Sequence, residues 1–329
     1  MEVFNPNSNI NFLGLRRISI TISAVLVVIA LGAIFVRGLN YGLDFTGGVL
    51  VEVEYANPVE VSDVRAALGA AGYGDAQVVS SGARDVAIRL QNREAKTDAA
   101  AGASGGTAAA AQAKTRNDQL AAEVLKALQV KRSDARIKSN DFVSATVGDE
   151  LKSDGIIAVL FVIIGIMIYI GMRFEWRFAI AAIASEFHDT ILTVGFYAIT
   201  QHEFDITVLA SVLAVVGYLI NDKVVVFDRV REIFRSSRRG EPVEILNRAI
   251  NSTLSRTIIT ALFTGVTMVA LYFFGGPVVH GFALTMIIGI VIGTLSSIFF
   301  ANPILLWLGV SKKDLMPVTR DNPELARRP

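Results

Sequence analysis

Cysteine is absent from this 329-residue chain, and charged residues make up only 19% of it. The absence of cysteine excludes disulfides, thiolate nucleophiles and cysteine-ligated zinc. Only three histidines are present, which argues against a histidine-rich metal site. Soluble proteins contain about 25% charged residues, so the low charge, together with 52% hydrophobic residues, argues against a soluble enzyme or a disordered chain. The net charge of +1 gives no overall basic character, so nucleic acid is not an expected partner.

The hydrophobic residues fall into six blocks, each close to the ~20 residues that an α-helix needs to cross a bilayer. The first block is longer than a signal-peptide core and lacks a small-residue cleavage site, so we expect a retained anchor. The sequence therefore predicts an α-helical polytopic membrane protein with six transmembrane helices. They are residues 18–36, 155–172, 178–200, 206–227, 257–274 and 281–308.

The loops between these blocks differ in positive charge. Lys and Arg are found in residues 1–17, 173–177, 228–250 and the tail 309–329, whereas the short loops Gln201–Asp205 and Gly275–His280 have none. Because positively charged loops stay in the cytoplasm, both termini are predicted to be cytoplasmic. The long segment 37–154 is then expected to lie on the outer side of the membrane.

The exported segment 37–154 has the pattern of a small α+β domain. Strands are expected at 49–55, 76–80, 85–90 and 135–143, because apolar residues alternate or cluster there. One helix, with Ser62 as its expected N-cap, carries Val64, Ala67, Leu68 and Ala71 on one face; a second carries Leu120, Val124 and Leu128. The order βαββαβ predicts a ferredoxin-like fold. Residues 95–118, rich in Ala and Gly, are expected to form a flexible loop, or at most a frayed helix around Ala108–Ala113.

Motifs of soluble enzymes are missing. No Gly-Lys pair is present, so a Walker phosphate loop is excluded. His202-Glu203 begins a zinc-protease pattern, but Ile206 stands where the second histidine ligand would be. The sequence therefore predicts neither a hydrolytic active site nor a cofactor or metal.

Two ionisable residues in the cytoplasmic half of the spans have matching depths. Asp222 lies in the fourth block, where removal from water favours the neutral carboxyl, and Arg256 begins the fifth block with a guanidinium that stays charged. Protonation of Asp222 would weaken its attraction to Arg256, which makes the pair a possible switch in a proton pathway. The pair is equally compatible with a static ion pair, or with Arg256 extending to lipid head groups.

Other polar residues support this region. Tyr218 lies one turn before Asp222 on the same helix face and is an expected hydrogen-bond donor, and Asn221 adjoins the acid. In the middle of the third block stand Glu186, His188 and Asp189. These three residues suggest either a proton relay or hydrogen bonds to neighbouring helices or a partner subunit.

Two further features have simpler interpretations. The arginine-rich segment between Arg229 and Arg248 is expected to form an amphipathic helix on anionic lipids, or else a docking surface for a cytoplasmic partner. Gly289 and Gly293 form a small-xxx-small pair, which is typical of close helix packing.

Several motifs together resemble the SecD/SecF family of membrane proteins. Asp44-Phe45-Thr46-Gly47-Gly48 resembles the signature that follows the first span. The stretches 173–177, His188-Asp189, 217–229, 253–257, 274–277 and 293–298 are also similar to SecF-type members, in order along the chain. The resemblance covers nearly the whole sequence except the Ala/Gly-rich loop and the tail.

The resemblance implies an accessory subunit of the bacterial Sec translocase in the inner membrane. It implies pairing with SecD, a six-plus-six-span unit of the resistance-nodulation-division superfamily, and contact with YajC, the SecYEG translocon and the exported unfolded polypeptide. The family uses the proton gradient to support export, with a membrane aspartate and arginine that correspond to Asp222 and Arg256. A further acidic residue comes from SecD. The nearest alternative is a small-molecule exporter of the same superfamily; an intramembrane enzyme or a purely structural scaffold are the others.

Three positions depart from the family pattern. Lys223 replaces a small hydroxyl residue directly after Asp222, Leu219 replaces a serine, and Glu186 is unusual beside the His-Asp pair. An ammonium beside Asp222 would favour the ionised carboxylate. The preferred interpretation is that Lys223 points about 100° away around the helix and reaches the cytoplasmic interface.

Overall fold

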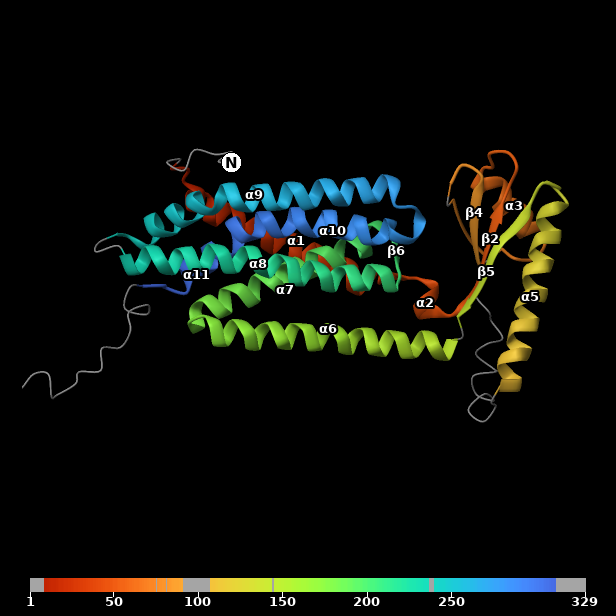
Figure 1. Cartoon of the computed structure of the whole chain (residues 1–329), viewed down its shortest axis with the longest axis horizontal. Coiled ribbons are helices and arrows are strands. Elements are labelled where there is room, and N and C mark those ends of the chain that lie inside the picture. Colours follow the sequence, from red (N-terminus) through yellow and green to blue (C-terminus); the bar gives the residue numbers. More distant parts are fainter. Residues whose placement is uncertain are drawn as a thin grey trace, which may run out of the picture. The chain divides into compact units, whose positions relative to one another are not determined.

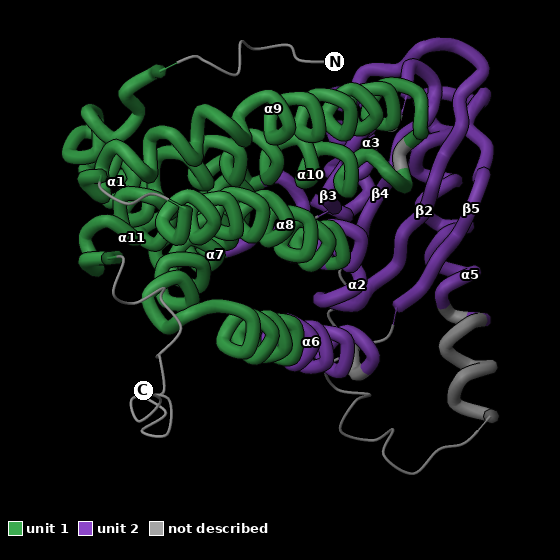
Figure 2. The backbone as a smooth tube through the Cα atoms, turned by 60° about the vertical axis from the view of Figure 1, so that its left-hand side comes forward, with its two compact units in different colours: residues 1–38, 161–201, 210–329 green, residues 39–160, 202–209 purple. Residues whose placement is uncertain are grey.

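A computed structural model describes residues 9–74, 76–80, 82–90, 107–143, 145–236 and 240–311 of the chain (Figure 1). The chain divides into two compact units, which are coloured in Figure 2. Unit 1 contains residues 1–38, 161–201 and 210–329 and is helical. Unit 2 contains residues 39–160 and 202–209 and includes a four-stranded sheet.

The long helices coincide with the hydrophobic blocks of the sequence. In the part of the chain that the structure describes, five helices are long and apolar enough to cross a membrane: those within 12–36, 147–173, 206–236, 242–274 and 278–307. The helix α7 is not among these five, although it has 25 residues, because its centre carries Glu186, His188 and Asp189. The helices are α1 (Arg16–Val36), α6 (Ala145–Arg173), α7 (Trp176–Thr200), α8 (Ile206–Ser236), α9 (Pro242–Phe274), α10 (Pro277–Ser296), and α11 (Asn302–Trp307), which is joined to α10 by the π-helix η3 (Ser297–Ala301).

Small residues allow the helices of unit 1 to approach closely. A Cβ atom on Gly195 of α7 would lie 3.0 Å from the Cα atom of Ala30 on α1. Gly289 and Gly293 of α10 receive Val215 and Leu219 of α8, since a Cβ atom on either glycine would overlap those side chains. The prediction of close packing at this glycine pair is therefore confirmed, and Leu219 fills the space above Gly293.

The segment 228–250 is not a separate amphipathic helix, so this prediction was wrong. Helix α8 continues to Ser236 and α9 begins at Pro242, so both helices extend past the predicted span ends. Their apolar residues, among them Val230, Phe234 and Leu246, are buried in the core of unit 1. Arg235 and Arg248 are exposed on the outer side of the same helices, because the inner side packs against protein.

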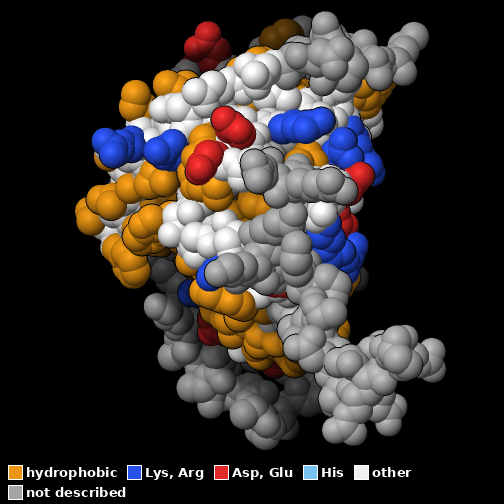
Figure 3. Space-filling model, turned by 90° about the vertical axis from the view of Figure 1, so that its left-hand side faces the viewer, with side chains coloured by type: hydrophobic (Ala, Val, Ile, Leu, Met, Phe, Trp, Pro, Cys, Tyr) orange, Lys and Arg blue, Asp and Glu red, His pale blue; other side chains and the backbone are white. Residues whose placement is uncertain are grey.

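At one end of unit 1, hydrogen bonds and an ion pair join the ends of several helices. The 3-10 helix η1 (Phe12–Leu15) is held at α9, where the backbone N–H of Leu13 donates to Asn247 Oδ1 at 3.0 Å. Near the other end of the chain, Arg177 donates to the Gly309 carbonyl at 2.8 Å. Arg173 pairs with Asp228 at 2.7 Å, which joins the end of α6 to α8. Figure 3 looks onto this end and shows Lys and Arg side chains around apolar ones.

The sheet of unit 2 is antiparallel, with the strand order β3-β4-β2-β5. Val49, Val51 and Val53 point to one face and are fully buried, as the alternation in the sequence predicts. Residues of α3 (Val61–Ala70) and α5 (Thr107–Gln129) complete this core. The strands are β2 (Gly48–Glu54), β3 (Gln77–Ser80), β4 (Asp85–Leu90) and β5 (Arg136–Val143), and each agrees with its predicted strand to within a residue at either end.

Two local predictions in unit 2 were wrong. Ser62 is not the N-cap of α3: the helix begins at Val61, Glu60 is the cap residue, and no side chain caps the helix. Residues 107–118 of the predicted flexible loop belong to α5, a helix longer than the frayed turn expected there. Consecutive alanines are strong helix formers, which accounts for this start. Residues 95–106 lie outside the described part of the chain.

A short strand pair connects two distant parts of unit 2. Strand β1 (Asn40–Tyr41) pairs in parallel with β6 (Glu203–Phe204), directly before α8. The rings of Tyr41, Phe45 and Phe204 pack together there, with centroids 5.9 to 6.3 Å apart. The loop before α8 is thus fixed to the segment that follows α1.

Candidate functional site

A cluster of charged side chains is buried where α7 packs against α8. The ammonium of Lys223 lies 2.6 Å from Glu186 Oε2 and 2.8 Å from Asp189 Oδ2. Glu186 and Asp189 are three residues apart and share one face of α7, as the spacing predicts. Lys223 is 1% exposed, so this ammonium depends on these two carboxylates for its charge compensation.

The prediction that the Lys223 side chain extends to the cytoplasmic interface was therefore wrong. The side chain points across to the middle of α7, where two acids at the same depth compensate its charge. The resemblance noted in the sequence marks both Lys223 and Glu186 as departures from the family pattern, but nothing in the sequence linked one to the other. A signal was present, since an extra acid and an extra base appeared in neighbouring spans, but only the packing of the helices brings them together.

His188 completes the cluster on the side of Asp189. Its Nδ1 lies 2.8 Å from Asp189 Oδ1, within hydrogen-bond distance. The imidazole stacks on Phe300 of the π-helix η3, with centroids 4.1 Å apart. The buried Nε2 atom of His188 has no hydrogen-bond partner among the described residues. Phe300 was not predicted from the sequence, because a phenylalanine in an apolar span carries no distinguishing signal.

Asp222 is buried beside this cluster but is not part of it. The residue is 5% exposed, and its Oδ2 atom has no hydrogen-bond partner in the part of the chain that the structure describes. Asp222 and Arg256 do not form an ion pair within 4.0 Å. Arg256 is nevertheless close enough to act on the carboxylate electrostatically, and it is exposed on the surface of this single chain. The two predicted residues thus share a region without direct contact.

The polar residues next to Asp222 point elsewhere. The hydroxyl of Tyr218 donates to Thr264 Oγ1 on α9 at 3.3 Å, so it is not the donor to Asp222 that the sequence suggested. Asn221 is exposed. Asp222 is therefore left without the hydrogen bonds that would hold a buried carboxylate in its charged form.

The residues 44–48 form a compact connection within unit 2. Asp44 Oδ2 accepts a 3.0 Å hydrogen bond from the backbone N–H of Ile206, the first residue of α8. Phe45 is buried, and Thr46 ends the short helix α2 (Leu43–Thr46), its hydroxyl donating to the Gly42 carbonyl at 3.0 Å. Gly47 and Gly48 have backbone φ angles of 68° and 139°, which residues other than glycine rarely adopt.

The start of α8 carries further charged groups. Asp205 Oδ1 accepts from the Val208 N–H at 2.7 Å, and Arg89 of β4 forms an ion pair with Glu203 of β6. Burial raises the pKa of the Asp205 carboxyl above its ordinary value, with a smaller increase from the neighbouring Asp44 and an opposing effect from the Val208 N–H. Burial also lowers the pKa of Arg89, against the attraction of Asp205 and Asp44. Within unit 2, charged groups thus surround the first turn of α8.

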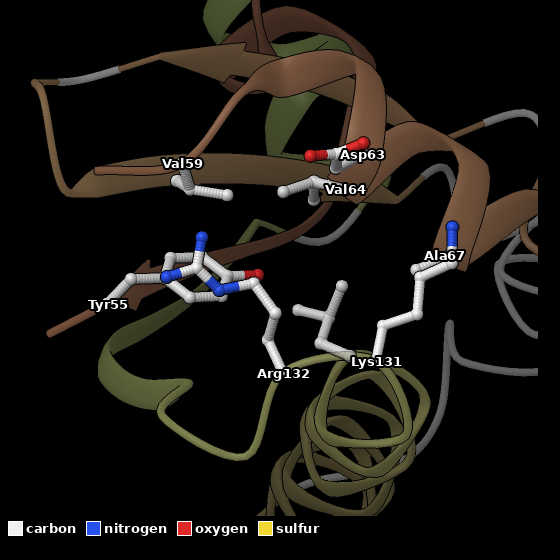
Figure 4. A pocket seen from close by; sticks show the side chains of 8 residues that line it. Tyr55, Val59, Asp63, Val64, Ala67, Lys131 and Arg132 are labelled. Atoms are coloured by element: carbon white, nitrogen blue, oxygen red, sulfur yellow. The ribbon is translucent and has the colours of Figure 1, made fainter. Parts of the chain in front are cut away.

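A pocket of about 230 Å³ lies in unit 2, between α3 and the end of α5 (Figure 4). Its wall includes Tyr55, Asp63, Lys131 and Arg132, and the Arg132 guanidinium lies 5.2 Å from the centroid of the Tyr55 ring. None of the predicted site residues lines this pocket. Among the described residues, no group of three His, Cys, Asp or Glu side chains is arranged to hold a metal ion.

Comparison with known proteins places these features in a family. The chain matches the family "Protein export membrane protein SecD/SecF, C-terminal" over residues 123–311, and the "SecD/SecF GG Motif" over residues 32–59. It is 42% identical to the protein translocase subunit SecF of Pseudomonas aeruginosa over 311 residues, which is 94% of each chain. It is 38% identical to the SecF subunit of Escherichia coli O157:H7, covering 90% of this chain and 86% of that one.

A solved structure agrees with this similarity. The chain is similar to the crystal structure of SecDF, a translocon-associated membrane protein, from Thermus thermophilus, with a TM-score of 0.77 and 31% identity. The match covers 93% of this chain but only 39% of the SecDF chain. A second SecDF crystal structure, in a super-membrane-facing form, gives a TM-score of 0.65 with 32% identity.

Proposed function

Since the chain belongs to the SecD/SecF family of protein export membrane proteins, we propose that it couples proton flow through Asp222 to protein export. It is a subunit of the SecF type in a protein translocase, a transport component with several membrane-crossing helices in the inner membrane. The relatives do not favour the alternative of a small-molecule exporter. The proposed part is how the subunit works, with which partners, and in which orientation.

We propose six membrane spans, with α7 as the sixth in addition to the five apolar helices. The acids of α7 are covered by Lys223, His188 and Phe300, which supports a spanning helix whose charges face protein. The arginines at the end of unit 1 that holds η1 and Gly309 support cytoplasmic termini. The strand order of unit 2 supports a ferredoxin-like domain in the periplasm. The domain boundaries proposed are those predicted from the sequence, except that α8 and α9 extend into residues 228–250 and α5 begins at Thr107.

The observation that carries the proposed mechanism is the burial of Asp222 without a hydrogen-bond partner for Oδ2. A charged carboxylate in that position is unfavourable, so proton binding stabilises it, and release requires an attracting cation. Arg256 supplies that cation at a distance, and its exposure leaves it accessible to a neighbouring subunit. A proton that moves inward releases about 2.3 kcal/mol per 100 mV of membrane potential, which is available for a change in helix packing.

We propose that this change reaches unit 2 through α8. Helix α8 carries Asp222 near its middle, and the backbone N–H of its first residue, Ile206, donates to Asp44. Gly47 and Gly48 stand between α2 and the body of strand β2, on the chain that leads from α1 into the sheet. The bonds of Asp44 and the β1–β6 pair add a second connection, to the helix of the proposed proton site itself.

The proposed partners follow from the family and from exposed apolar faces. SecD is the main partner, and relatives whose structures are titled SecDF support this pairing. YajC, the SecYEG translocon, an unfolded exported chain and anionic lipids remain proposed contacts. Large apolar side chains on α1, α6 and α9, such as Phe161 and Phe263, are exposed and would meet lipid or partner helices.

The test is proton flux and protein export in membrane vesicles containing SecD and variants of this chain. We expect Asp222→Asn and Arg256→Met to lose at least tenfold of both activities, because either change removes one partner of the switch. Glu232→Gln on the same helix is the matched control: Glu232 is exposed and pairs only with Arg229 among the described ion pairs, so activity should be unchanged. Wild-type flux in Asp222→Asn would refute the assignment.

A further inference from the structure

The charged cluster between α7 and α8 has an unequal number of charges. Glu186 and Asp189 contribute two carboxylates, and Lys223 contributes one ammonium to both of them. Glu186 and Asp189, both from α7, face Lys223; His188 of the same helix lies 2.8 Å from Asp189, and Phe300 of η3 stacks on the His188 ring. Beside Glu186, a cavity of about 10 Å³ is lined by Ile163, Ile166 and Met167 of α6 and by apolar residues and Thr190 of α7. Among the described residues, Lys223 is thus the ammonium that both carboxylates of this cluster share.

Asp222 and Lys223 are consecutive in the chain, yet their side chains point in different directions and contact different groups. Consecutive residues of an α-helix point about 100° apart, so Lys223 reaches α7 while Asp222 does not. Asp222 makes no ion pair within 4.0 Å with Lys223, whose Nζ is held at 2.6 and 2.8 Å by the two acids of α7. The ammonium is therefore engaged elsewhere and leaves Oδ2 of Asp222 without a partner.

We propose that Lys223 is a positioning residue, whose fixed pairing with Glu186 and Asp189 locks α7 to α8 and leaves Asp222 as the acid that exchanges protons. The two departures from the family pattern then compensate each other: the extra base requires the extra acid. Without Lys223 the two carboxylates of α7 would be buried with no counter-charge, and one of them would take up a proton. Asp222 would then no longer be the single proton-binding acid of this region.

The compensation can be tested with three variants of the full chain in complex with SecD: Lys223→Ser, Glu186→Gln and the double variant. We expect Lys223→Ser to lower proton flux at least tenfold and to add a step to its pH profile, because an acid of α7 now binds protons as well. The double variant should return to within twofold of native flux with a native pH profile. Lys126→Ser removes an exposed lysine of α5 and should match the native chain.

Two results would overturn the proposal: a native pH profile in Lys223→Ser, or a double variant no better than Lys223→Ser alone. If Lys223→Ser cannot be isolated, recovery of a folded complex with the double variant supports the pairing, and failure of both contradicts it. This inference rests on the proposed function where proton flux is the quantity measured. The thermal unfolding midpoint, lowered in Lys223→Ser and restored in the double variant, tests the pair even if Asp222→Asn has native flux and the proposed function fails.

Discussion

The contact between α8 and α10 is the point at which one added methyl group should have a large effect. Val215 and Leu219 of α8 lie over Gly289 and Gly293 of α10. A Cβ atom on Gly293 would lie 2.7 Å from Leu219 Cγ and closer still to both of its methyl carbons. Rotation about the last side-chain bond does not relieve this overlap, because Cγ itself is too near. The Gly293→Ala variant must therefore move α8 and α10 apart or force Leu219 out of its rotamer.

Overpacking of this kind costs about 1–3 kcal/mol, which is roughly a 5- to 150-fold change in the folding equilibrium. We expect that loss in SDS-induced unfolding of the purified chain in mixed micelles, followed by circular dichroism. The control is Gly165→Ala in α6, where no atom lies within 4 Å of the added Cβ. That variant should be as stable as the native chain, or slightly more so, because alanine is the better helix former.

A double variant distinguishes steric overlap with Leu219 from any other effect of alanine at position 293 on stability. Leu219→Ala alone should cost about 2–5 kcal/mol by leaving a cavity. In Gly293→Ala/Leu219→Ala the new methyl group occupies part of that cavity, so the combined loss should be smaller than the sum by about 1 kcal/mol or more. The reasoning fails if Gly293→Ala is as stable as Gly165→Ala, or if the two losses simply add.

Two further predictions concern unit 2. Burial raises the pKa of the Asp205 carboxyl, so the folded state binds a proton there more tightly than the unfolded state does. This proton binding stabilises the folded state at low pH, and the stabilisation is lost as the pH rises through the pKa of the folded state. Asp205→Asn keeps a side-chain oxygen that can accept from the Val208 N–H, so it should reduce the change of the thermal unfolding midpoint between pH 4 and 8. An unchanged pH dependence would show that Asp205 is not its source. Gly48→Ala should destabilise the sheet by about 1–3 kcal/mol in thermal unfolding, because φ is 139° and the added Cβ would lie 2.5 Å from the Leu90 carbonyl oxygen. Gly69→Ala, with open space around it, should be harmless, and equal losses in both variants would disprove the steric argument.

Periodicity along the chain determined most of the elements. The hydrophobic blocks predicted the long helices, because a run of about 20 apolar residues has one stable structure in a membrane. The alternation around Val51 predicted β2 and the face that it buries. Helix ends were less predictable, as the lengths of α8 and α9 show, because tertiary packing buried apolar residues beyond the expected spans.

The sequence by itself determined which ionisable residues lie within the spans, since a charge inside an apolar block is evident from order alone. It identified Asp222, Arg256, Glu186, His188 and Asp189 as residues that need a partner or a role, whereas Lys223 was expected to reach the cytoplasmic interface. Only the tertiary structure decided which of them meet. Lys223 turns to Glu186 and Asp189 because α7 packs beside α8 with its acids at the same depth, and helix packing of this kind depends on contacts between residues far apart in the chain.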